Sequence, residues 1–395
     1  MSSAVIVSAR RTPIGKFMGG FRDVPAAVLG GAAARAAVAD AGLKPEEVDE
    51  AFFGHGRQAG NGPNTARQAI FKAGLPETVP AWTLNKACGS GLQAIVSAAE
   101  RIALGESRIV LAGGMEAMSR TPFILPRMRE GYRLGSAEVQ DAMVIDGFLC
   151  PMSGLLMGQT AEKLARLKGI GRSEQDEFAA LSQQRCEAAR KAGRFADEIV
   201  PVDGKGSDGK PAPITADEHP RDGVVAASLG RLAPVFAQDG SITAANASGI
   251  TDGGAAVVVM AEDEAKRRGL KPLARIVAAT TEGVDPSIMG IGPVPAVRSL
   301  LERIGGGVDQ FDLIELNEAF AAQVLACDRD LALPADRLNV NGGAIALGHP
   351  IGATGARIVV TLLHEMRRRG ARKGLATLCI SGGMGMAVAF EAPQG

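Results

Sequence analysis

Cys88 stands among small residues in the stretch NKACGSGLQA, immediately before apolar residues that recur every three to four positions and predict a helix over residues 90–104. Unpaired N–H groups and the positive dipole end at a helix start stabilise an anion, so this placement predicts a lowered pKa for the thiol and a nucleophilic role. The flanking Gly89 and Gly91 are expected to leave the sulfur open to a substrate carbonyl. The alternative is a small buried hydrophobe, which is the commoner role of a single cysteine and the one that this segment alone favours.

His349 is the second candidate for chemistry, and it lies in the glycine-rich stretch NGGAIALGHPIGATG ahead of an expected helix over residues 355–369. Glycines gather where a backbone must turn sharply or approach a ligand. A lone histidine is more often structural, but only this one of the four has such a setting. We interpret His55, His219 and His364 as structural or solvated, and His349 as the candidate base.

Two further segments place polar groups at the ends of expected strands. LATLCISGGMG puts Cys379 at the end of a buried strand, and IELNEAFAAQ puts Asn317 and Glu318 where another strand runs into a helix. Active sites gather at the carboxyl ends of parallel strands. Helix capping is an alternative role for Asn317 and Glu318, and it is compatible with catalysis. A nucleophile, its base, a second thiol and an amide that can hold a water or an oxyanion would then converge on one cleft.

The elements that position these groups follow a repeated order. Short apolar runs alternate with helices in the first part of the chain, as in a parallel sheet covered on both faces, and the order returns near the C-terminus. RIVLAGGME and GLATLCISGGMG both run from an apolar strand into Gly-Gly-Met. We expect a duplicated α/β core, with residues 1–118 plus 250–270 as the N-terminal half and 271–395 as the C-terminal half. Residues 119–249 break the order and predict an inserted loop domain with a long helix and a hairpin.

Composition limits the classes of function. The 395 residues are 46% apolar and 22% charged with no net charge, which is typical of a soluble globular protein and argues against nucleic acid as a partner. Five widely spaced cysteines without a CxxC pair argue against a disulfide framework or a zinc site and favour a reducing compartment. No apolar run is long enough to span a membrane, and the start MSSAVIVSARRTPIG is interpreted as a strand. We therefore expect a cytoplasmic protein.

In combination, these segments resemble the thiolase family of acyl-CoA:acetyl-CoA acyltransferases over nearly the whole chain. The motifs that carry the resemblance are SARRTPIGKFMGGF, NKACGSGLQA, GGMEAMS, NASGITDGGAA, ELNEAF, NGGAIALGHPIGATGAR and CISGGMG. It implies the five-layer αβαβα thiolase fold with a loop domain inserted in the first half. It also implies a homotetramer (a dimer of dimers), or at least a dimer. The implied substrates are acetyl-CoA, longer acyl-CoA and free CoA, with no metal or redox cofactor.

The resemblance also implies a role for each candidate residue in a ping-pong reaction. Cys88 would carry the acyl group as a thioester, His349 would accept its proton, and Cys379 would exchange a proton with the methyl carbon of acetyl-CoA. Backbone N–H groups of Cys88 and Ser381 would stabilise the thioester oxyanion. His349 and a water held by Asn317 would stabilise the enolate oxygen.

CoA contacts are also carried by the resemblance. They fall on Ser248 of NASG, with Arg221 and Ser228 as weaker candidates, and a solvated loop charge is an equally good interpretation of Arg221. The basic run MRRRGARKG, residues 366–374, is interpreted as a helix C-terminus, where basic residues are favoured, and not as a phosphate site.

Two positions depart from the family. Many short-chain members carry a histidine before Met-Gly in the loop domain, whereas this chain reads LLMGQTAE around Met157. We expect a broader or longer acyl range from this loss of a polar group. Ser381 replaces a glycine, and it would be strained if its φ were positive.

The sequence therefore predicts reversible Claisen condensation and thiolytic cleavage of acetoacetyl-CoA or longer 3-ketoacyl-CoA. A ketoacyl synthase of the same fold is one alternative, but it would pair its cysteine with two histidines, or with His and Asn, and would lack Cys379. A non-catalytic acyl-CoA-binding homologue is another alternative, and it would be expected to lose the nucleophile or the base.

Overall fold

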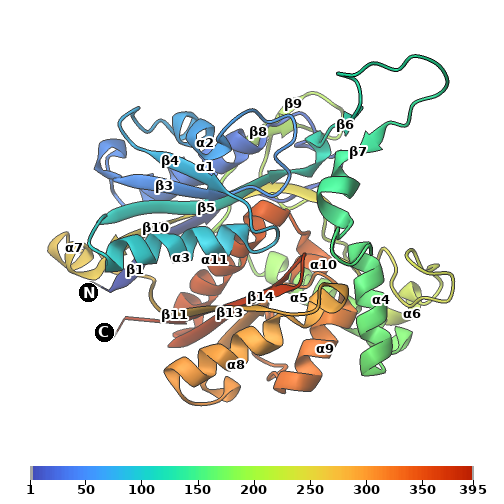
Figure 1. Ribbon diagram of the computed structural model, residues 1–395. Helices are drawn as coiled ribbons and strands as arrows, with labels where there is room; N and C mark the ends of the chain where they lie inside the picture. Colours follow the sequence, from blue (N-terminus) through green and yellow to red (C-terminus); the bar gives the residue numbers. More distant parts are fainter. Residues whose placement is uncertain (1–2, 394–395) are drawn as a thin grey trace.

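One ten-stranded sheet forms the framework of the chain, and its two parts, called here the first and the second sheet, are joined by the pairing of β1 with β11 (Figure 1). The computed structural model describes residues 3–393. From edge to edge, the first sheet contains β4 (Ala81–Leu84), β3 (Glu50–Gly54), β5 (Ile109–Ala117), β10 (Thr251–Ala261) and β1 (Ala4–Arg11). The second contains β12 (Leu313–Leu316), β13 (Lys373–Ile380), β14 (Met384–Glu391) and β11 (Ala274–Gly283). The sheets meet where β1 and β11 pair over Val5–Arg275 and Ile6–Ala274.

Neither sheet is purely parallel, so the expectation of a parallel sheet was wrong in part. In the first sheet, β3 runs parallel to β4 and β5, but β10 is antiparallel to both of its neighbours. In the second, β12 and β13 are parallel, whereas β14 is antiparallel to β13 and β11. Only three residues separate β13 from β14, and such a short turn permits only a hairpin, because a parallel pair needs a long crossover.

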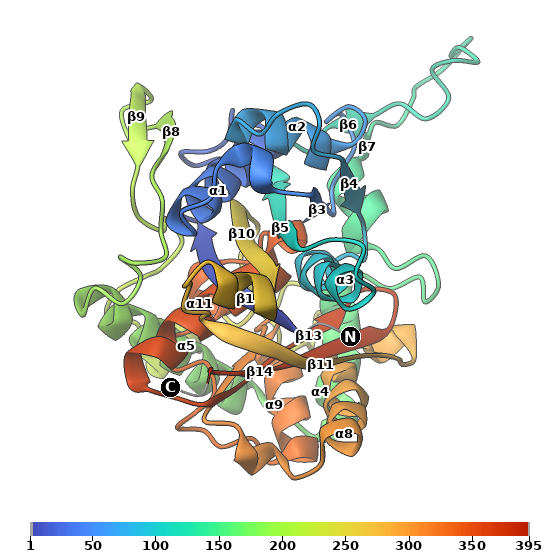
Figure 2. The same ribbon diagram turned by 90° about the vertical axis from the view of Figure 1, so that its left-hand side faces the viewer.

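Helices cover both sheets and separate them, which gives the predicted five layers (Figure 2). The outer layer on the first sheet is α1 (Ala26–Asp40) with α2 (Thr65–Ala73), the central layer is α3 (Ser90–Ala103) with α11 (Ile351–Arg369), and the outer layer on the second sheet is α8 (Pro293–Ile304) with α9 (Ala321–Leu331). The central layer shares one continuous core with strands of both sheets. The αβαβα architecture of the prediction is therefore confirmed.

Buried apolar side chains explain why the central helices form where they do. In α3, Leu92, Ile95 and Ile102 are at most 1% exposed, and each contributes roughly 1.5–3 kcal/mol by leaving water. The layer is thin because glycines allow close contact: a Cβ on Gly91 would lie 2.8 Å from the backbone nitrogen of Ala356 in α11. The starts of both helices are thereby held side by side.

The segment between β5 and β10 carries the irregular elements, including the expected hairpin and long helix. They are η2 (Met118–Arg120), β6 (Phe123–Ile124), β7 (Gln140–Asp141), the π-helix η3 (Val144–Phe148), α4 (Met157–Lys168), α5 (Arg172–Lys191), the hairpin of β8 (Val202–Lys205) and β9 (Pro211–Ile214), and α6 (Ala226–Leu229). The limits of the halves and of the inserted domain, placed at residues 118, 249 and 270, stay predictions.

Short elements complete the chain. They are β2 (Gly15–Lys16), η1 (Pro45–Glu47), α7 (Glu262–Arg267), η4 (Pro286–Ile291), η5 (Val308–Gln310) and α10 (Ala344–Leu347). Between residues 3 and 393, no helix is both long and apolar enough to cross a membrane.

Candidate functional site

Cys88 and His349 meet at the starts of the two central helices. The Sγ atom of Cys88 lies 3.3 Å from Nε2 of His349. Both side chains are largely buried, at 9% and 7% exposure, and each stands two residues before its helix, α3 or α11. The two residues are 261 positions apart in the sequence, and the fold brings them into hydrogen-bonding contact.

A tight turn presents the cysteine. Ala87 adopts a left-handed conformation with φ 45°, which costs about 1 kcal/mol for a residue with a Cβ. Its N–H donates to Asn85 Oδ1 at 2.9 Å, and its carbonyl accepts from Ser90 Oγ at 2.6 Å. The Ser90 hydroxyl also accepts the Lys86 N–H at 2.8 Å, so side chains on both sides of Cys88 hold the strained turn.

The two glycines beside Cys88 serve packing, and the expectation that they open the sulfur to substrate was wrong. A Cβ on Gly89 would lie 2.6 Å from Cδ1 of Ile380, and one on Gly91 would meet the backbone of α11. Cys88 instead borders a cavity that is described below.

Hydrogen bonds fix which nitrogen of His349 carries the proton. The Thr354 hydroxyl donates to the Pro350 carbonyl at 2.9 Å, so its oxygen is left to accept from Nδ1–H of His349 at 2.6 Å. Nε2 is then the unprotonated nitrogen, and it faces the thiol of Cys88. The imidazole is therefore oriented as a proton acceptor for Cys88.

Burial decides the charge state of the pair. It raises the pKa of the Cys88 thiol above its usual value, although Arg57 and the backbone N–H groups of Ser381 and Cys88 favour the thiolate. Burial, with the positive charges of Arg357 and Arg57, lowers the pKa of His349 to about 3. The predicted lowering of the Cys88 pKa by the helix start is wrong, because burial outweighs it. The resting pair is a thiol and a neutral imidazole.

Buried groups behind the pair hold the two helix starts in place. Glu116, at the end of β5, accepts N–H bonds from Gly56, Arg57 and Gly352 at 2.9–3.1 Å, and His55 Nε2 lies 3.2 Å from it. Burial raises the pKa of Glu116, but His55, Arg57 and the backbone N–H groups outweigh it, so the pKa stays low. Of the two roles expected for His55, structural or solvated, its full burial and this contact favour the structural one. Sequence reasoning missed Glu116, whose only signal was its place after a strand in GGMEA.

Cys379 lies at the end of β13, as expected, and is fully buried. Burial, reinforced by the neighbouring Cys88 and Cys327 sulfurs, raises its pKa well above the usual value, so it is a thiol at neutral pH. Its electrostatic interaction with Cys88 places the two sulfurs in one environment, although no hydrogen bond joins them among the described residues. The structure thus brings the second thiol to the same region as the nucleophile.

Asn317 directly follows β12, whose last residue pairs with Thr377 two positions before Cys379. It is 1% exposed, and neither its Oδ1 nor its Nδ2 has a hydrogen-bond partner within the described part of the chain. The capping alternative was wrong, because α9 begins at Ala321 and is capped without a side chain. A buried amide with free donor and acceptor is well suited to hold a water.

Glu318 has a structural role instead. Its carboxylate accepts from Ser182 Oγ at 2.6 Å, Asn339 Nδ2 at 2.9 Å and the Ile345 N–H at 3.1 Å. It thereby supports the loop that leads to His349, whose own N–H donates to the Gly249 carbonyl at 3.0 Å.

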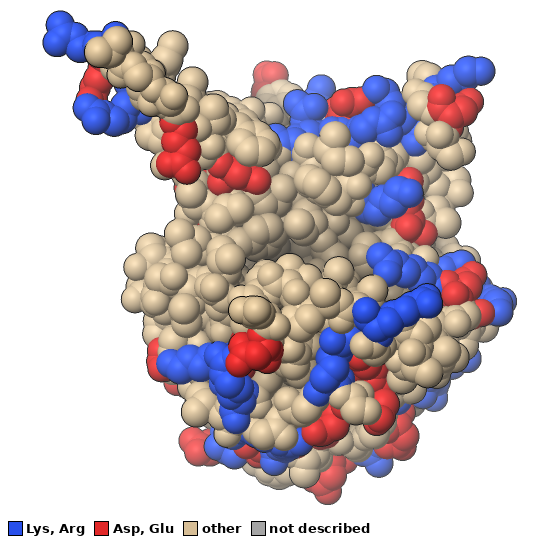
Figure 3. All heavy atoms as spheres, turned by 90° about the vertical axis from the view of Figure 1, so that its right-hand side faces the viewer, with Lys and Arg blue, Asp and Glu red and all other residues tan. Residues whose placement is uncertain are grey.

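A cavity of about 490 Å³ opens over Cys88 and His349. Its walls are mostly apolar and include Phe148, Leu156, Met157, Phe236, Met289 and Phe320. The predicted residues Ser248, Met157 and Ser381 line it, and so does Arg57, which sequence reasoning missed although it closely follows a buried strand in FFGHGRQAG. On the face of the molecule that carries α4, Figure 3 shows a hollow with mostly uncharged walls and Lys and Arg side chains beside it.

Of the two weaker CoA candidates, neither lines this cavity. Arg221 borders an adjoining small hollow that shares Ala244 with it. The Ser228 hydroxyl donates to the Val225 carbonyl at 2.7 Å within α6. Arg221 is therefore placed beside the cavity, and Ser228 is outside both hollows.

Ser381 is not strained. Its φ is not positive, whereas Gly382 and Gly383 after it have φ of 92° and 84°. The positive φ required by the β13–β14 turn falls on the glycines, so the serine leaves the backbone N–H of residue 381 directed at the Cys88 sulfur.

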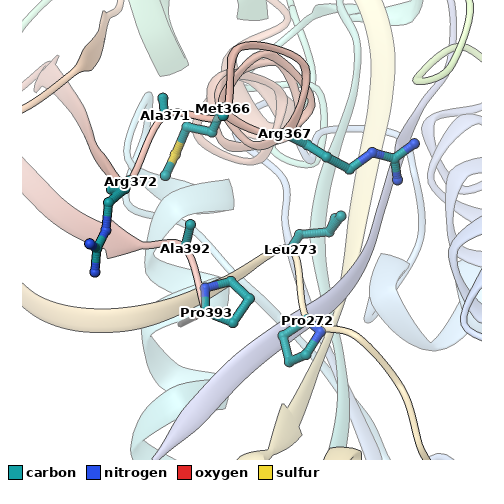
Figure 4. Close-up of a pocket in the computed structure, with 9 residues that line it drawn as sticks. Pro272, Leu273, Met366, Arg367, Ala371, Arg372, Ala392 and Pro393 are labelled. Carbon is teal, nitrogen blue, oxygen red and sulfur yellow. The ribbon is translucent and has the colours of Figure 1, made fainter. Parts of the chain in front are cut away.

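The basic run at the end of α11 lies elsewhere. A hollow lined by Leu273, Met366 and Ala392 opens there, and Figure 4 shows Arg367 and Arg372 extending away from one another on its two sides. It lies at the end of the molecule where both termini are found, opposite α4 (Figure 1). The two guanidinium groups do not converge on one phosphate, in line with the interpretation of this run as a helix C-terminus.

The fold and this geometry define an α/β protein in which the thiol of Cys88 and the imidazole of His349 meet beside an apolar cavity, with the second thiol of Cys379 near Cys88. No group of three metal-ligating side chains occurs within residues 3–393. The thiolase N-terminal domain family matches residues 4–263, and the thiolase C-terminal domain family matches residues 270–392. The chain belongs to the thiolase family.

Individual relatives resemble the chain over its whole length. An acetyl-CoA acetyltransferase of Allochromatium vinosum is 52% identical over 387 residues, which are 98% of each chain. The crystal structure of the Bacillus anthracis acetyl-CoA acetyltransferase has a TM-score of 0.96 at 47% identity, over 100% of this chain and 99% of that one. Human mitochondrial 3-ketoacyl-CoA thiolase in complex with CoA has a TM-score of 0.95 at 42% identity, over 99% and 98% of the two chains.

Proposed function

We propose that the protein is an acetyl-CoA C-acyltransferase that catalyses thiolytic cleavage of 3-ketoacyl-CoA and the reverse Claisen condensation through an acyl-enzyme on Cys88. The observation that carries this proposal is the 3.3 Å contact between Cys88 Sγ and the unprotonated Nε2 of His349 at the floor of an apolar cavity. Neither a ketoacyl synthase nor a non-catalytic acyl-CoA-binding homologue is favoured by the site, which retains the nucleophile, the base and the second thiol.

In the first half-reaction, Cys88 attacks the 3-keto carbonyl as His349 Nε2 takes the thiol proton. Because the resting pair is neutral, proton transfer accompanies attack instead of preceding it. The N–H groups of Cys88 and Ser381 would stabilise the oxyanion that forms, and the interaction of both with the Cys88 sulfur supports this role. The bond between carbons 2 and 3 then breaks, and the shortened acyl group stays on Cys88.

The electron pair of the broken bond leaves on the methylene carbon of acetyl-CoA. Cys379, which remains protonated at neutral pH, donates a proton to this carbon. His349 and a water held by Asn317 stabilise the enolate oxygen during the step, since Asn317 has a free amide. Free CoA then attacks the thioester and gives its thiol proton to the Cys379 thiolate. The proton held by His349 returns to the Cys88 sulfur as it leaves, so all three groups regain their resting states without a metal or redox cofactor.

For CoA, we propose that Ser248 contacts the pantetheine chain in the cavity and that Arg221, in the adjoining hollow, attracts a phosphate. Ser228 is the weakest candidate, because its hydroxyl is already bonded within α6. Leu156 occupies the position before Met157 at which many short-chain members carry a histidine, and both residues line the cavity. The surface near the acyl chain is therefore apolar at this position. This supports substrates longer than acetoacetyl-CoA.

We also propose a cytoplasmic homotetramer. All five cysteines are free thiols, as expected in a reducing compartment. The segment between β6 and β7 projects from the body as an arm (Figure 1) and exposes apolar side chains, including Leu134 at 100% and Met128 at 63%. Such side chains on an arm favour burial against a second copy.

The test is thiolysis at saturating CoA, with acetoacetyl-, 3-ketohexanoyl- and 3-ketodecanoyl-CoA as substrates, for wild type and Cys88→Ala. We expect cleavage of at least one substrate by wild type only, with mass spectrometry locating the acyl group on Cys88. Cleavage of acetoacetyl-CoA alone would contradict the longer acyl range. Absence of cleavage with every substrate would contradict the proposed function.

A further inference from the structure

Arg57 is a buried cation on the wall of the catalytic cavity. The residue is 4% exposed and lines the same cavity as Cys88, His349 and Ser381. Its positive charge lowers the pKa of both members of the Cys88–His349 pair. The proposed acyl transfer assigns no role to this group.

The guanidinium has a counter-charge nearby in Glu116, whose pKa it helps to lower, but it has few direct partners. Only Nη1 reaches an acceptor, the Asp146 carbonyl, and this bond is long at 3.4 Å. Nε is buried without a hydrogen-bond partner in residues 3–393, and Arg57 takes part in no ion pair there. The nearby Glu116 carboxylate is already occupied by three N–H groups and lies beside His55.

The fold makes room for this side chain. A Cβ on Gly147 would overlap the guanidinium carbon, so glycine is required where η3 passes Arg57. The ring of Phe148 lies 5.4 Å from the guanidinium carbon, at a distance where cation–π attraction operates. η3 therefore holds the guanidinium in place by contact, without neutralising it.

A buried charge is normally paired, because burial without a counter-ion costs several kcal/mol. Here no carboxylate forms a direct ion pair with the guanidinium in residues 3–393, and a ligand carboxylate that enters the cavity would supply one. We propose that Arg57 binds a carboxylate at the distal end of the acyl chain, so that the enzyme acts on 3-ketoacyl-CoA thioesters of dicarboxylic acids. This inference rests on the proposed thiolase function and specifies its substrate class.

The position of Arg57 distinguishes an acyl carboxylate from the phosphates of CoA. A phosphate is strongly hydrated and suits the open rim, where Arg221 lies in the adjoining hollow. Arg57 is buried beside the nucleophile and among apolar side chains, so an anion that reaches it belongs to the group attached to Cys88. With 3-ketoadipyl-CoA, the acyl group on Cys88 is succinyl. Its distal carboxylate takes no part in the reaction and can stay bound to Arg57 throughout.

The test compares two six-carbon substrates that differ only at the distal end, 3-ketoadipyl-CoA and 3-ketohexanoyl-CoA. For wild type, we expect kcat/KM of thiolysis to favour 3-ketoadipyl-CoA by about tenfold or more. Arg57→Leu should lower kcat/KM for 3-ketoadipyl-CoA by about 10- to 100-fold more than it lowers kcat/KM for 3-ketohexanoyl-CoA, the range of a charge-assisted hydrogen bond. A loss common to both substrates reports the effect of Arg57 on the Cys88–His349 pair. Arg57→Lys, which keeps the charge, should retain part of the preference even if the leucine variant folds poorly.

Arg221→Gln is the matched control, because a CoA contact is common to both substrates and its loss should affect both alike. Equal losses for the two substrates in Arg57→Leu would overturn the proposal and leave Arg57 with only its electrostatic effect on the Cys88–His349 pair. A wild type that does not prefer the dicarboxylic substrate would also overturn it.

Binding measured without turnover separates this proposal from the proposed function. Calorimetric titration of Cys88→Ala with the same two substrates should show tighter binding of 3-ketoadipyl-CoA, and Arg57→Leu in the same background should remove the difference. If wild type cleaves neither substrate but this preference persists, the reaction assignment fails and the carboxylate site stands. If the two bind equally, the carboxylate site fails whatever the reaction.

Discussion

The two halves of the core supply corresponding starts of central helices but different chemistry. Cys88 precedes α3 by two residues and His349 precedes α11 by two residues, and the pair meets at 3.3 Å. The strand ends beside them differ more. Near the end of β5, Glu116 accepts hydrogen bonds from backbone N–H groups. At the end of β13, by contrast, Cys379 and the N–H of Ser381 interact with the sulfur of Cys88.

The ends of β5 and β13 are therefore used differently. The end of β13 interacts with Cys88, whereas the end of β5 has a structural role and holds the start of α11 in place. Glu116 joins the loop after β3 to the N–H of Gly352 in α11, so a residue of the first half fixes the helix that carries the base from the second. The site therefore belongs to both halves, although its reactive groups are divided unevenly between them.

The largest effect should come from removing the two sulfurs separately. Cys88→Ala should lower thiolysis by more than about 10⁴-fold and abolish acyl-enzyme formation, because the covalent route is lost. Cys379→Ala should also lose thiolysis and condensation, but should still become acetylated at Cys88 when incubated with acetyl-CoA. Steady-state rates and intact-mass spectrometry would measure the two properties.

Cys327→Ala is the control for this comparison, because Cys327 is a third buried thiol whose pKa burial raises to about 12. Its thiolysis rate should stay within about threefold of wild type. If Cys379→Ala fails to acetylate at Cys88, the division of labour between the two sulfurs is contradicted.

The second effect concerns the structural strand end. Glu116→Ala should lower the free energy of unfolding by about 3–5 kcal/mol, because it removes a buried charge and leaves the N–H groups of Gly56, Arg57 and Gly352 unsatisfied. Urea unfolding would measure it. Glu116→Gln keeps an acceptor and should lose less. A loss below about 1 kcal/mol in the alanine variant would contradict the role assigned to this strand end.

Much of the framework was predictable from local sequence, because apolar periodicity reports burial directly. The helix expected over residues 90–104 occurs as Ser90–Ala103. The helix expected over residues 355–369 begins earlier, at Ile351, because Gly352 and Gly355 allow contact with neighbouring backbone instead of breaking the helix. The antiparallel β10 was not predicted, since strand direction depends on pairing between distant segments.

The site was predictable in composition but not in its energetics. The family resemblance identified Cys88 and His349, and the structure brings them into contact. The pKa of Cys88 was predicted in the wrong direction because burial is a property of the tertiary structure, which a helix-start motif does not report. Arg57 was missed for a similar reason: it lies 31 positions before Cys88 in the sequence, and only the fold shows that both line one cavity.

A third prediction concerns the charge of His349, which is neutral in the folded protein, whereas Glu116 is ionised. The pKa of His349 is lowered from 6.5 to about 3 in the folded protein, so the unfolded chain binds more protons between these values. Folding stability must therefore fall as pH decreases through this window. From pH 7 to pH 5, His349 should account for a loss of about 2 kcal/mol in wild type that His349→Gln does not show. Urea unfolding of both proteins at the two pH values would measure the difference, and equal losses would contradict a neutral buried imidazole.

The smallest effect should come from Thr354, a positioning residue that touches only the far side of the base. Thr354→Val removes the acceptor of His349 Nδ1–H, so the tautomer with its lone pair toward Cys88 is no longer favoured. We expect kcat/KM to fall by about tenfold, with less change in substrate binding, because part of the imidazole would carry its proton on Nε2 and could not accept the proton of Cys88. Thr354→Ser keeps the hydroxyl and should retain most of the rate. If the valine variant were slow only because it is less stable, the serine variant, which also changes the packing, would be slow as well. A valine variant that acylates Cys88 as fast as wild type would show that the contact with the sulfur is sufficient to orient His349.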